Sequence, residues 1–179
     1  MIRAADALSA LRQRLAAAST TASLDAEILL AHVLGTSRAE LARQSGLALQ
    51  PSQTEALEEL VLRRIAGEPV AYLTGRREFW SLELEITPDV LVPRPETELL
   101  VDLALAALAR VSGPAVLDLG TGSGAIALAI ARERTDAAVT AVDASGAALE
   151  VAKRNAGRLG IRNVNFLYGS WYEPAGSAR

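Results

Sequence analysis

Residues 116–131, VLDLGTGSGAIALAIA, decide the fold of this chain. A short strand-like run ends at Leu119, the glycine-rich loop GTGSG occupies residues 120–124, and an apolar helical segment follows directly. Glycines permit a tight turn and let a ligand approach bare backbone, and the first turn of the following helix offers unpaired N–H groups. The order of strand, loop and helix therefore predicts a site for a nucleotide or nucleoside ligand. The alternative that these residues leave open is a tight turn without a ligand.

The pattern of strand and helix continues beyond the loop. Strands are expected at residues 115–119, 138–143 and 164–168, with helices at 124–133 and 147–159 between them. Strands that alternate with helices of about a dozen residues pair in parallel through right-handed crossovers. The second half of the chain therefore predicts an α/β domain of the Rossmann-like kind.

Asp143 ends the strand that follows the loop, about 20 residues further along the chain. An acid at this point is placed to accept hydrogen bonds from the two hydroxyls of a ribose. Two ligands are compatible with the loop and this acid. With Ala125 in the place of a third glycine, the loop matches a dinucleotide fingerprint and suggests NAD. Asp118, however, puts a carboxylate where a pyrophosphate is disfavoured, and it suits the amino group and sulfonium of S-adenosylmethionine. The residues favour S-adenosylmethionine and leave NAD as the alternative.

The first part of the chain, residues 1–73, repeats apolar residues at intervals of three and four. This spacing predicts a small domain of four or five helices. Ser37 with Glu40 and Ser52 with Glu55 match the capping box that begins a helix. We expect the cationic pair Arg63-Arg64 to lie on a solvated face, and the solitary His32 to be a helix-surface or hydrogen-bonded residue, not a catalyst.

Between the two parts, the apolar period changes to two over residues 74–92, which predicts a β-hairpin linker with a turn at Pro88-Asp89. The residues expected on its buried side are Phe79, Leu82, Leu84, Ile86 and Val90. A further helix is expected from Pro95 to Arg110, because proline suits a first helical turn.

Composition excludes several classes of protein. The 179 residues include no cysteine and one histidine, which removes disulfide scaffolds, thiolate nucleophiles and the usual metal centres, so no metal site is expected. A net charge of -3 argues against direct binding of nucleic acid. No apolar stretch of membrane-spanning length occurs, and the N-terminus lacks the apolar core of a signal peptide. We therefore expect a cytoplasmic protein that does not bind membranes.

Five segments together resemble one family, the bacterial release factor glutamine methyltransferases, also described as N5-glutamine methyltransferases. They are PVAYLTGRREFWSLELEIT (69–87), VLVPRPETELLVDLAL (90–105), the loop segment (116–131), VTAVDASGAALEVAKRNAGRLG (139–160) and NVNFLYGSWYEP (163–174). The loop is shared by many methyltransferases, whereas PRPETE and GSW are narrower motifs. The resemblance covers nearly the whole chain.

The resemblance implies a class I S-adenosylmethionine-dependent methyltransferase fold, with S-adenosylmethionine as methyl donor. The implied substrate is the glutamine of the Gly-Gly-Gln loop of peptide chain release factors, and residues 1–73 would help to bind that partner. The implied cofactor-binding residues are Gly120, Thr121, Gly122, Ser123 and Gly124 on the methionine side, Asp143 at the ribose and Trp171 near the adenine. Arg94 or Glu96 is expected to border the same site.

The family's catalytic motif, Asn-Pro-Pro-Tyr after the fourth strand, has no counterpart among residues 1–179. We therefore assign no catalytic residue and expect residues 93–179 to form the N-terminal half of the methyltransferase domain, inactive by itself. In an incomplete sheet the strand at 115–119 should be an exposed apolar edge. The complete protein is expected to be a monomer.

Overall fold

The computed structural model describes residues 2–43 and 46–175. The chain divides into two compact units, Met1–Thr74 and Gly75–Arg179, which are described separately. Within the described residues, no helix is long and apolar enough to cross a membrane.

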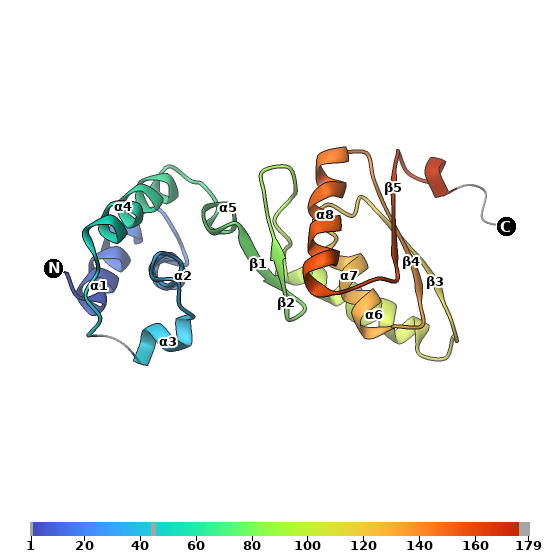
Figure 1. Cartoon of the computed structure of the whole chain (residues 1–179), viewed down its shortest axis with the longest axis horizontal. Helices are drawn as coiled ribbons and strands as arrows, with labels where there is room; N and C mark the ends of the chain where they lie inside the picture. The colour runs from blue at the N-terminus through green and yellow to red at the C-terminus, as the bar shows by residue number, and fades with distance from the viewer. Residues whose placement is uncertain (1, 44–45, 176–179) are drawn as a thin grey trace. The chain divides into compact units, whose positions relative to one another are not determined.

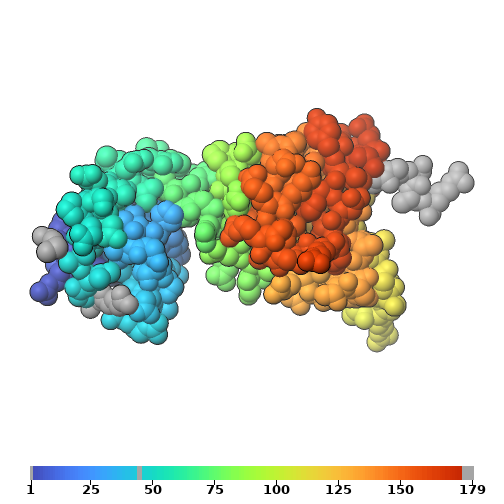
Figure 2. Space-filling view, in the orientation of Figure 1, coloured from blue at the N-terminus to red at the C-terminus, as the bar shows by residue number. Residues whose placement is uncertain are grey.

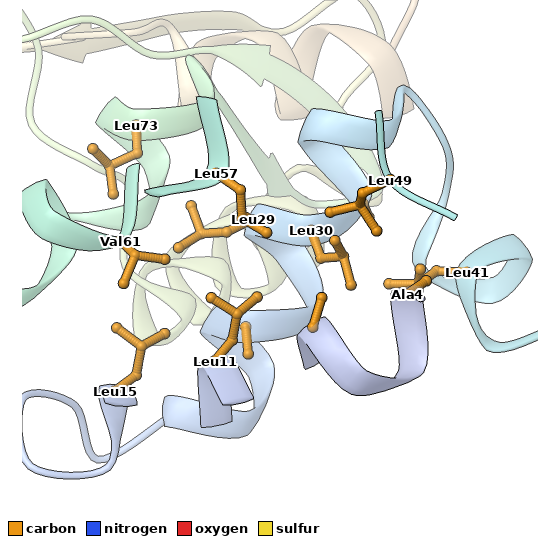
Figure 3. Close-up of a cluster of buried hydrophobic side chains, with 13 residues drawn as sticks. Ala4, Leu11, Leu15, Leu29, Leu30, Leu41, Leu49, Leu57, Val61 and Leu73 are labelled. Carbon is orange, nitrogen blue, oxygen red and sulfur yellow. The ribbon is translucent and has the colours of Figure 1, made fainter. Parts of the chain in front are cut away.

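The first unit is a bundle of helices, as the three-and-four spacing predicts. Its helices are α1 (Ala4–Leu15), α2 (Ala22–Leu34), α3 (Arg38–Arg43), α4 (Pro51–Ile65) and α5 (Val70–Thr74). Their apolar faces meet in one core, whose largest side chains are leucines (Figure 3). Leu15, Leu29, Leu30 and Val61 are completely buried there. Burial of each such side chain contributes about 1.5–3 kcal/mol, so the core and not intrinsic propensity holds these helices together.

Of the two expected helix starts, one is confirmed in part and one is wrong. The Ser37 hydroxyl accepts a hydrogen bond from the N–H of Glu40 at 3.1 Å, at the start of α3. The capping box of α4, however, joins Gln50 and Gln53, with the Gln50 N–H donating to Oε1 of Gln53 at 2.9 Å. Pro51 is the reason, because its fixed φ suits the first helical position and starts the helix before Ser52.

The expectation of a solvated face is wrong for Arg64. Its Nε donates to Oδ2 of Asp25 at 2.8 Å, and the two side chains are only 16% and 5% exposed. The hydroxyls of Ser19 and Thr21 donate to the same carboxylate at 2.7 and 3.0 Å. A buried charge is tolerated only when it is paired and hydrogen-bonded, and this cluster meets both conditions between α2 and α4. His32, by contrast, lies exposed on a helix surface, as expected.

The second unit begins with the expected β-hairpin, which is formed by β1 (Arg76–Phe79) and β2 (Leu82–Glu85). Its turn is Trp80-Ser81, with φ values of 51° and 57°, whereas Pro88-Asp89 makes a second turn further along. The five residues expected on the buried side are all buried. The hairpin packs against helix α8 (Gly146–Leu159), and Figure 2 shows its green surface beside the orange surface of that helix.

The helix expected from Pro95 to Arg110 is divided at its start. A single 3-10 turn, η1 (Pro95–Thr97), leads into α6 (Glu98–Leu108). Only Val101 of α6 is buried, and Leu99, Leu100 and Leu103 are between 55% and 60% exposed. An apolar helix with so little of its surface covered presents a face that other groups can cover.

The α/β part has the predicted order of elements. The strands are β3 (Ala115–Leu119), β4 (Ala138–Asp143) and β5 (Val164–Tyr168), with α7 (Ala125–Glu133) and α8 between them. The strands pair in parallel in the order β3-β4-β5. Both crossovers step in the same direction across the sheet, so right-handed connections place α7 and α8 on the same face. Figure 1 shows both helices on one side of the three strands.

β3 lies at an edge of this sheet among the described residues, as expected, and Leu117 in its middle is 38% exposed. An unpaired strand edge with apolar side chains favours pairing with another chain. We expect residues 1–179 to self-associate as their concentration rises, and Leu117→Lys to suppress this because a charge at an edge opposes pairing. Sedimentation velocity over a concentration series measures both. A monomer at every concentration in the parent chain would contradict the expectation.

Candidate functional site

The glycine-rich loop at residues 120–124 folds over the carboxyl end of β4. The N–H groups of Gly120 and Thr121 both donate to the carbonyl of Val142, at 2.8 and 3.0 Å. The three loop glycines all have positive φ: 77° at Gly120, 55° at Gly122 and 84° at Gly124. Side chains with a Cβ are strained in this region, so the glycines are required by the backbone path.

The glycines differ in their surroundings. A Cβ added at Gly120 or Gly122 would meet nothing within 4 Å, so the space beside these two residues is open to a ligand. A Cβ at Gly124 would lie 3.0 Å from Cδ1 of Leu128 and 3.2 Å from Cβ of Ala152. The first part of the loop is therefore open, and its last glycine packs closely against α7 and α8.

Asp143 holds the loop from the end of β4. Its Oδ2 accepts the N–H of Gly122 at 2.8 Å, and its Oδ1 accepts the N–H of Ser145 at 2.9 Å. Each carboxylate oxygen accepts about two hydrogen bonds, so each oxygen keeps one further acceptor position. Asp143 is half-buried and reaches solvent. Its carboxylate shapes the loop and can still accept two hydroxyl groups of a ligand.

Asp118 supplies a second carboxylate, just before the loop. Its Oδ2 accepts the hydroxyl of Thr121 at 2.7 Å. Burial raises the pKa of Asp118, and the nearby charge of Asp143 acts in the same direction, while hydrogen bonds from Thr121 and the Ala127 N–H oppose the rise. The raised pKa means that the buried charge costs folding free energy at neutral pH, a cost relieved as the pH falls through the folded-state pKa. A carboxylate kept here at such a cost favours a ligand that carries positive charge.

Not every candidate residue presents a free side chain. Thr121 and Ser123 are 6% and 2% exposed, and the Thr121 hydroxyl is engaged within the loop. Gly120 is exposed, and Gly122, Asp118 and Asp143 are half-buried. The part of the site open to a ligand therefore consists of two glycines and two carboxylates.

Trp171, the expected adenine contact, follows β5 at the same carboxyl end of the sheet. Its side chain is 72% exposed, with φ at 49°, and its contact with a ligand stays a prediction. Arg94 precedes η1 and Glu96 lies within it, and both side chains are exposed. Their place at the border of the site stays a prediction. Among the described residues, no group of three histidine, cysteine, aspartate or glutamate side chains is arranged to hold a metal ion.

One residue of this region was missed by sequence reasoning. Asn155 is completely buried, and its Nδ2 donates to the carbonyl of Ser123 in the loop at 2.9 Å. The available signal was its position in the sequence, because Val151, Ala152 and Ala156 share its buried face of α8. A polar residue among apolar neighbours at helical spacing indicates a buried hydrogen-bonding role.

The fold and this loop define the class of the second unit. A protein-family model described as a methyltransferase domain matches residues 110–177, and residues 75–175 have the α/β fold with a parallel sheet of that class. A second model, described as the PrmC N-terminal domain, matches residues 6–75.

The curated relatives that match most of this chain share one name. The release factor glutamine methyltransferase of Coxiella burnetii is 48% identical over 171 residues, which are 96% of this chain and 62% of that protein. The protein of the same name from Burkholderia pseudomallei is 53% identical over 160 residues, 87% of this chain and 56% of that protein. The chain is therefore similar, over most of its length, to the release factor glutamine methyltransferases of these bacteria.

The chain spans roughly half to two thirds of the length of these relatives, at 62% and 56%. Among solved structures, a ribosomal protein L11 methylase from Lactobacillus delbrueckii subsp. bulgaricus aligns with a TM-score of 0.41 and 27% identity. That alignment covers 52% of this chain and 46% of the other.

Proposed function

We propose that this chain binds S-adenosyl-L-methionine in a protein methyltransferase that modifies the side-chain amide nitrogen, N5, of a glutamine in peptide chain release factors. The observation that carries the proposal is the pair of carboxylates, Asp118 and Asp143, which accept hydrogen bonds from Thr121 and Gly122 of an open glycine loop. The relatives that share this loop region are named release factor glutamine methyltransferases, which supports both the reaction and the substrate. The glutamine of the Gly-Gly-Gln motif is the acceptor that we assign. The cytoplasm, where release factors act, is the compartment that we assign.

The residues of the loop suit this cofactor better than NAD. When bound, S-adenosyl-L-methionine supplies a methyl group made electrophilic by the positive sulfonium. Asp143 would accept the ribose hydroxyls at its two free acceptor positions, and the carboxylate of Asp118 would face the cationic methionine end. The pyrophosphate of NAD would instead place its negative charges beside the carboxylate of Asp118.

The amide nitrogen of the substrate glutamine is a poor nucleophile. The lone pair of an amide nitrogen is delocalised into the carbonyl, so the enzyme must align the nitrogen with the methyl–sulfur bond and accept hydrogen bonds from its two N–H groups. We assign neither acceptor to a residue of this chain, since it contains no Asn-Pro-Pro-Tyr. The residues described here would hold the donor and orient its methyl group.

Contact with the release factor is assigned to the helical unit. This unit matches the PrmC N-terminal domain and has a shallow hollow of about 380 Å³ between α2 and α4. The hollow is lined by both polar and apolar side chains, among them His32, Gln53, Glu59 and Leu60. Mixed surfaces of this kind are typical of non-obligate protein interfaces.

Two measurements test the proposal. Calorimetric titration should show binding of S-adenosyl-L-methionine, with NAD much weaker; tighter binding of NAD would support an oxidoreductase or regulatory role instead. The second assay follows radioactive methyl transfer to a release factor, with a variant lacking the Gly-Gly-Gln glutamine as control. We expect residues 1–179 to bind the donor without transferring methyl groups. Transfer by these residues would show that they include the amide acceptors, contrary to our assignment.

Asp118→Asn separates the binding role of this carboxylate from its effect on stability. Asparagine keeps an acceptor for the Thr121 hydroxyl and removes a buried charge whose pKa is raised by burial. At pH 7 we expect the melting temperature to stay level or rise, while affinity for S-adenosyl-L-methionine falls about tenfold, the value of one charged hydrogen bond. If stability and affinity fall together, Asp118 is a structural residue and not a cofactor ligand.

A further inference from the structure

Asn155 joins three parts of the second unit through one side chain. Its Oδ1 accepts the N–H of Glu85 at 2.6 Å, and its Nδ2 donates to the carbonyl of Glu85 at 3.1 Å. The same Nδ2 donates to the carbonyl of Ser123 at 2.9 Å. The amide therefore connects α8, the end of the hairpin strand β2 and the glycine loop, and it is completely buried.

The bond to Ser123 fixes a peptide plane inside the loop. The carbonyl of Ser123 and the N–H of Gly124 belong to the same planar peptide group, so neither turns without the other. That N–H donates to the carbonyl of Thr121 at 2.9 Å and closes the loop. Loss of the Asn155 donor would leave a buried carbonyl without a partner, which favours rotation of this peptide.

Neighbouring contacts hold α8 against the same two partners. Ala152, one turn before Asn155, is the residue that a Cβ at Gly124 would approach to 3.2 Å. Arg154 donates from Nη2 to the carboxylate of Glu85 at 2.7 Å. The loop and the hairpin thus contact adjacent turns of one helix, and Asn155 bonds to both.

We propose that Asn155 is a positioning residue of the cofactor loop, and that it makes the shape of the loop depend on the docked hairpin. The effect on cofactor affinity rests on the function proposed above. The coupling itself concerns residues 82–86 and 120–124 of the chain, and it is measurable with no cofactor present.

Asn163 provides a matched control in the same unit. Its Nδ2 also donates to backbone carbonyls, those of Ala131, Arg134 and Ala137, at 3.1, 3.1 and 3.2 Å. These carbonyls lie away from the loop, at the end of α7 and the start of β4. Asn163→Ala therefore removes an equivalent bridging amide and leaves the contacts of the loop unchanged.

The test is amide hydrogen exchange of the chain without cofactor, with global stability measured by urea unfolding. Asn155→Ala and Asn155→Asp should raise the exchange rates of the Gly122 and Gly124 amides about tenfold or more beyond the change in global stability. Asn163→Ala should change these amides only as much as global stability changes. Equal effects of the Asn155 and Asn163 variants on the loop would overturn the proposal.

Two further readouts complete the test. If the Asn155 variants do not fold, hydrogen exchange of the parent chain at low urea tests the coupling instead. Coupled amides of the loop and the hairpin should open with the same free energy and the same urea dependence. Independent opening of the Gly124 and Ile86 amides would refute the coupling. With S-adenosyl-L-methionine added, Asn155→Ala should bind about tenfold more weakly than Asn163→Ala. If the parent chain binds no S-adenosyl-L-methionine, the proposed function is wrong. The hydrogen-exchange measurement still tests the coupling between the hairpin and the loop in that case.

Discussion

Asp143→Ala is expected to lower the affinity for S-adenosyl-L-methionine about a hundredfold or more. Two hydroxyl hydrogen bonds to a carboxylate contribute about 1.5–3 kcal/mol each, and every 1.4 kcal/mol is a factor of ten. The substitution also releases the N–H of Gly122, which Asp143 holds at 2.8 Å, so the loop loses its shape as well as its ligand contact. Calorimetric titration measures the change.

Asp136→Ala is the control for this substitution. Asp136 precedes the other end of β4 and likewise accepts a backbone N–H, that of Gly113, at 2.9 Å. The substitution should leave cofactor affinity unchanged, because Asp136 bonds to Gly113 and Arg134 and not to the loop. A loss of less than about threefold in Asp143→Ala would be too small for two charged hydrogen bonds and would remove Asp143 from the binding site.

The second large effect is expected in the helical unit, where Arg64→Met should lower the free energy of unfolding by about 3–5 kcal/mol. The substitution keeps an apolar stem but leaves the carboxylate of Asp25, only 5% exposed, without its cation. Removal of one partner from a buried ion pair is costly because the other charge stays uncompensated. Urea unfolding followed by circular dichroism reports the loss of helix.

Arg63→Met is the control, one residue earlier on the same helix. The side chain of Arg63 is 44% exposed and pairs with Glu68 and Glu59 near solvent. Exposed pairs of this kind add little to stability, so the change should be small. Adding Asp25→Asn to Arg64→Met should restore part of the lost stability, because it removes the unpaired charge. Equal effects of the Arg63 and Arg64 substitutions would show that the buried pair of Arg64 and Asp25 adds no more to the free energy of unfolding than an exposed pair.

Most of the second unit could be predicted from local pattern. The bounds of β3, β4 and β5 agree with those expected, because apolar runs bounded by turn residues define strands without reference to the rest of the chain. The hairpin was also predictable from its period of two. Its turn was not, because Trp80 and Ser81 adopt φ values of 51° and 57° without the glycine or asparagine that usually marks such a turn.

The sequence predicted which residues form the candidate site, but not most of the contacts that they make. The loop and Asp143 follow from their order along the chain, and the structure brings them together through the bond between Asp143 and Gly122. The buried state of Thr121 and the exposure of Trp171 did not follow from order alone. Both depend on which neighbours cover a side chain once the elements have packed.

The sequence by itself determined the helical first unit, the hairpin, the parallel order of strands and helices and the glycine loop with its acid. Each of these rests on periodicity or on a backbone conformation that near neighbours specify. Only the tertiary structure decided that Arg64 neutralises a buried Asp25 and that Asn155 joins the hairpin to the loop. These partners lie 39 and 70 residues apart in the chain. Such partners are brought together only when whole helices and strands pack. A buried polar group without a hydrogen-bond partner costs folding free energy, so each buried polar side chain must be paired in the packed structure.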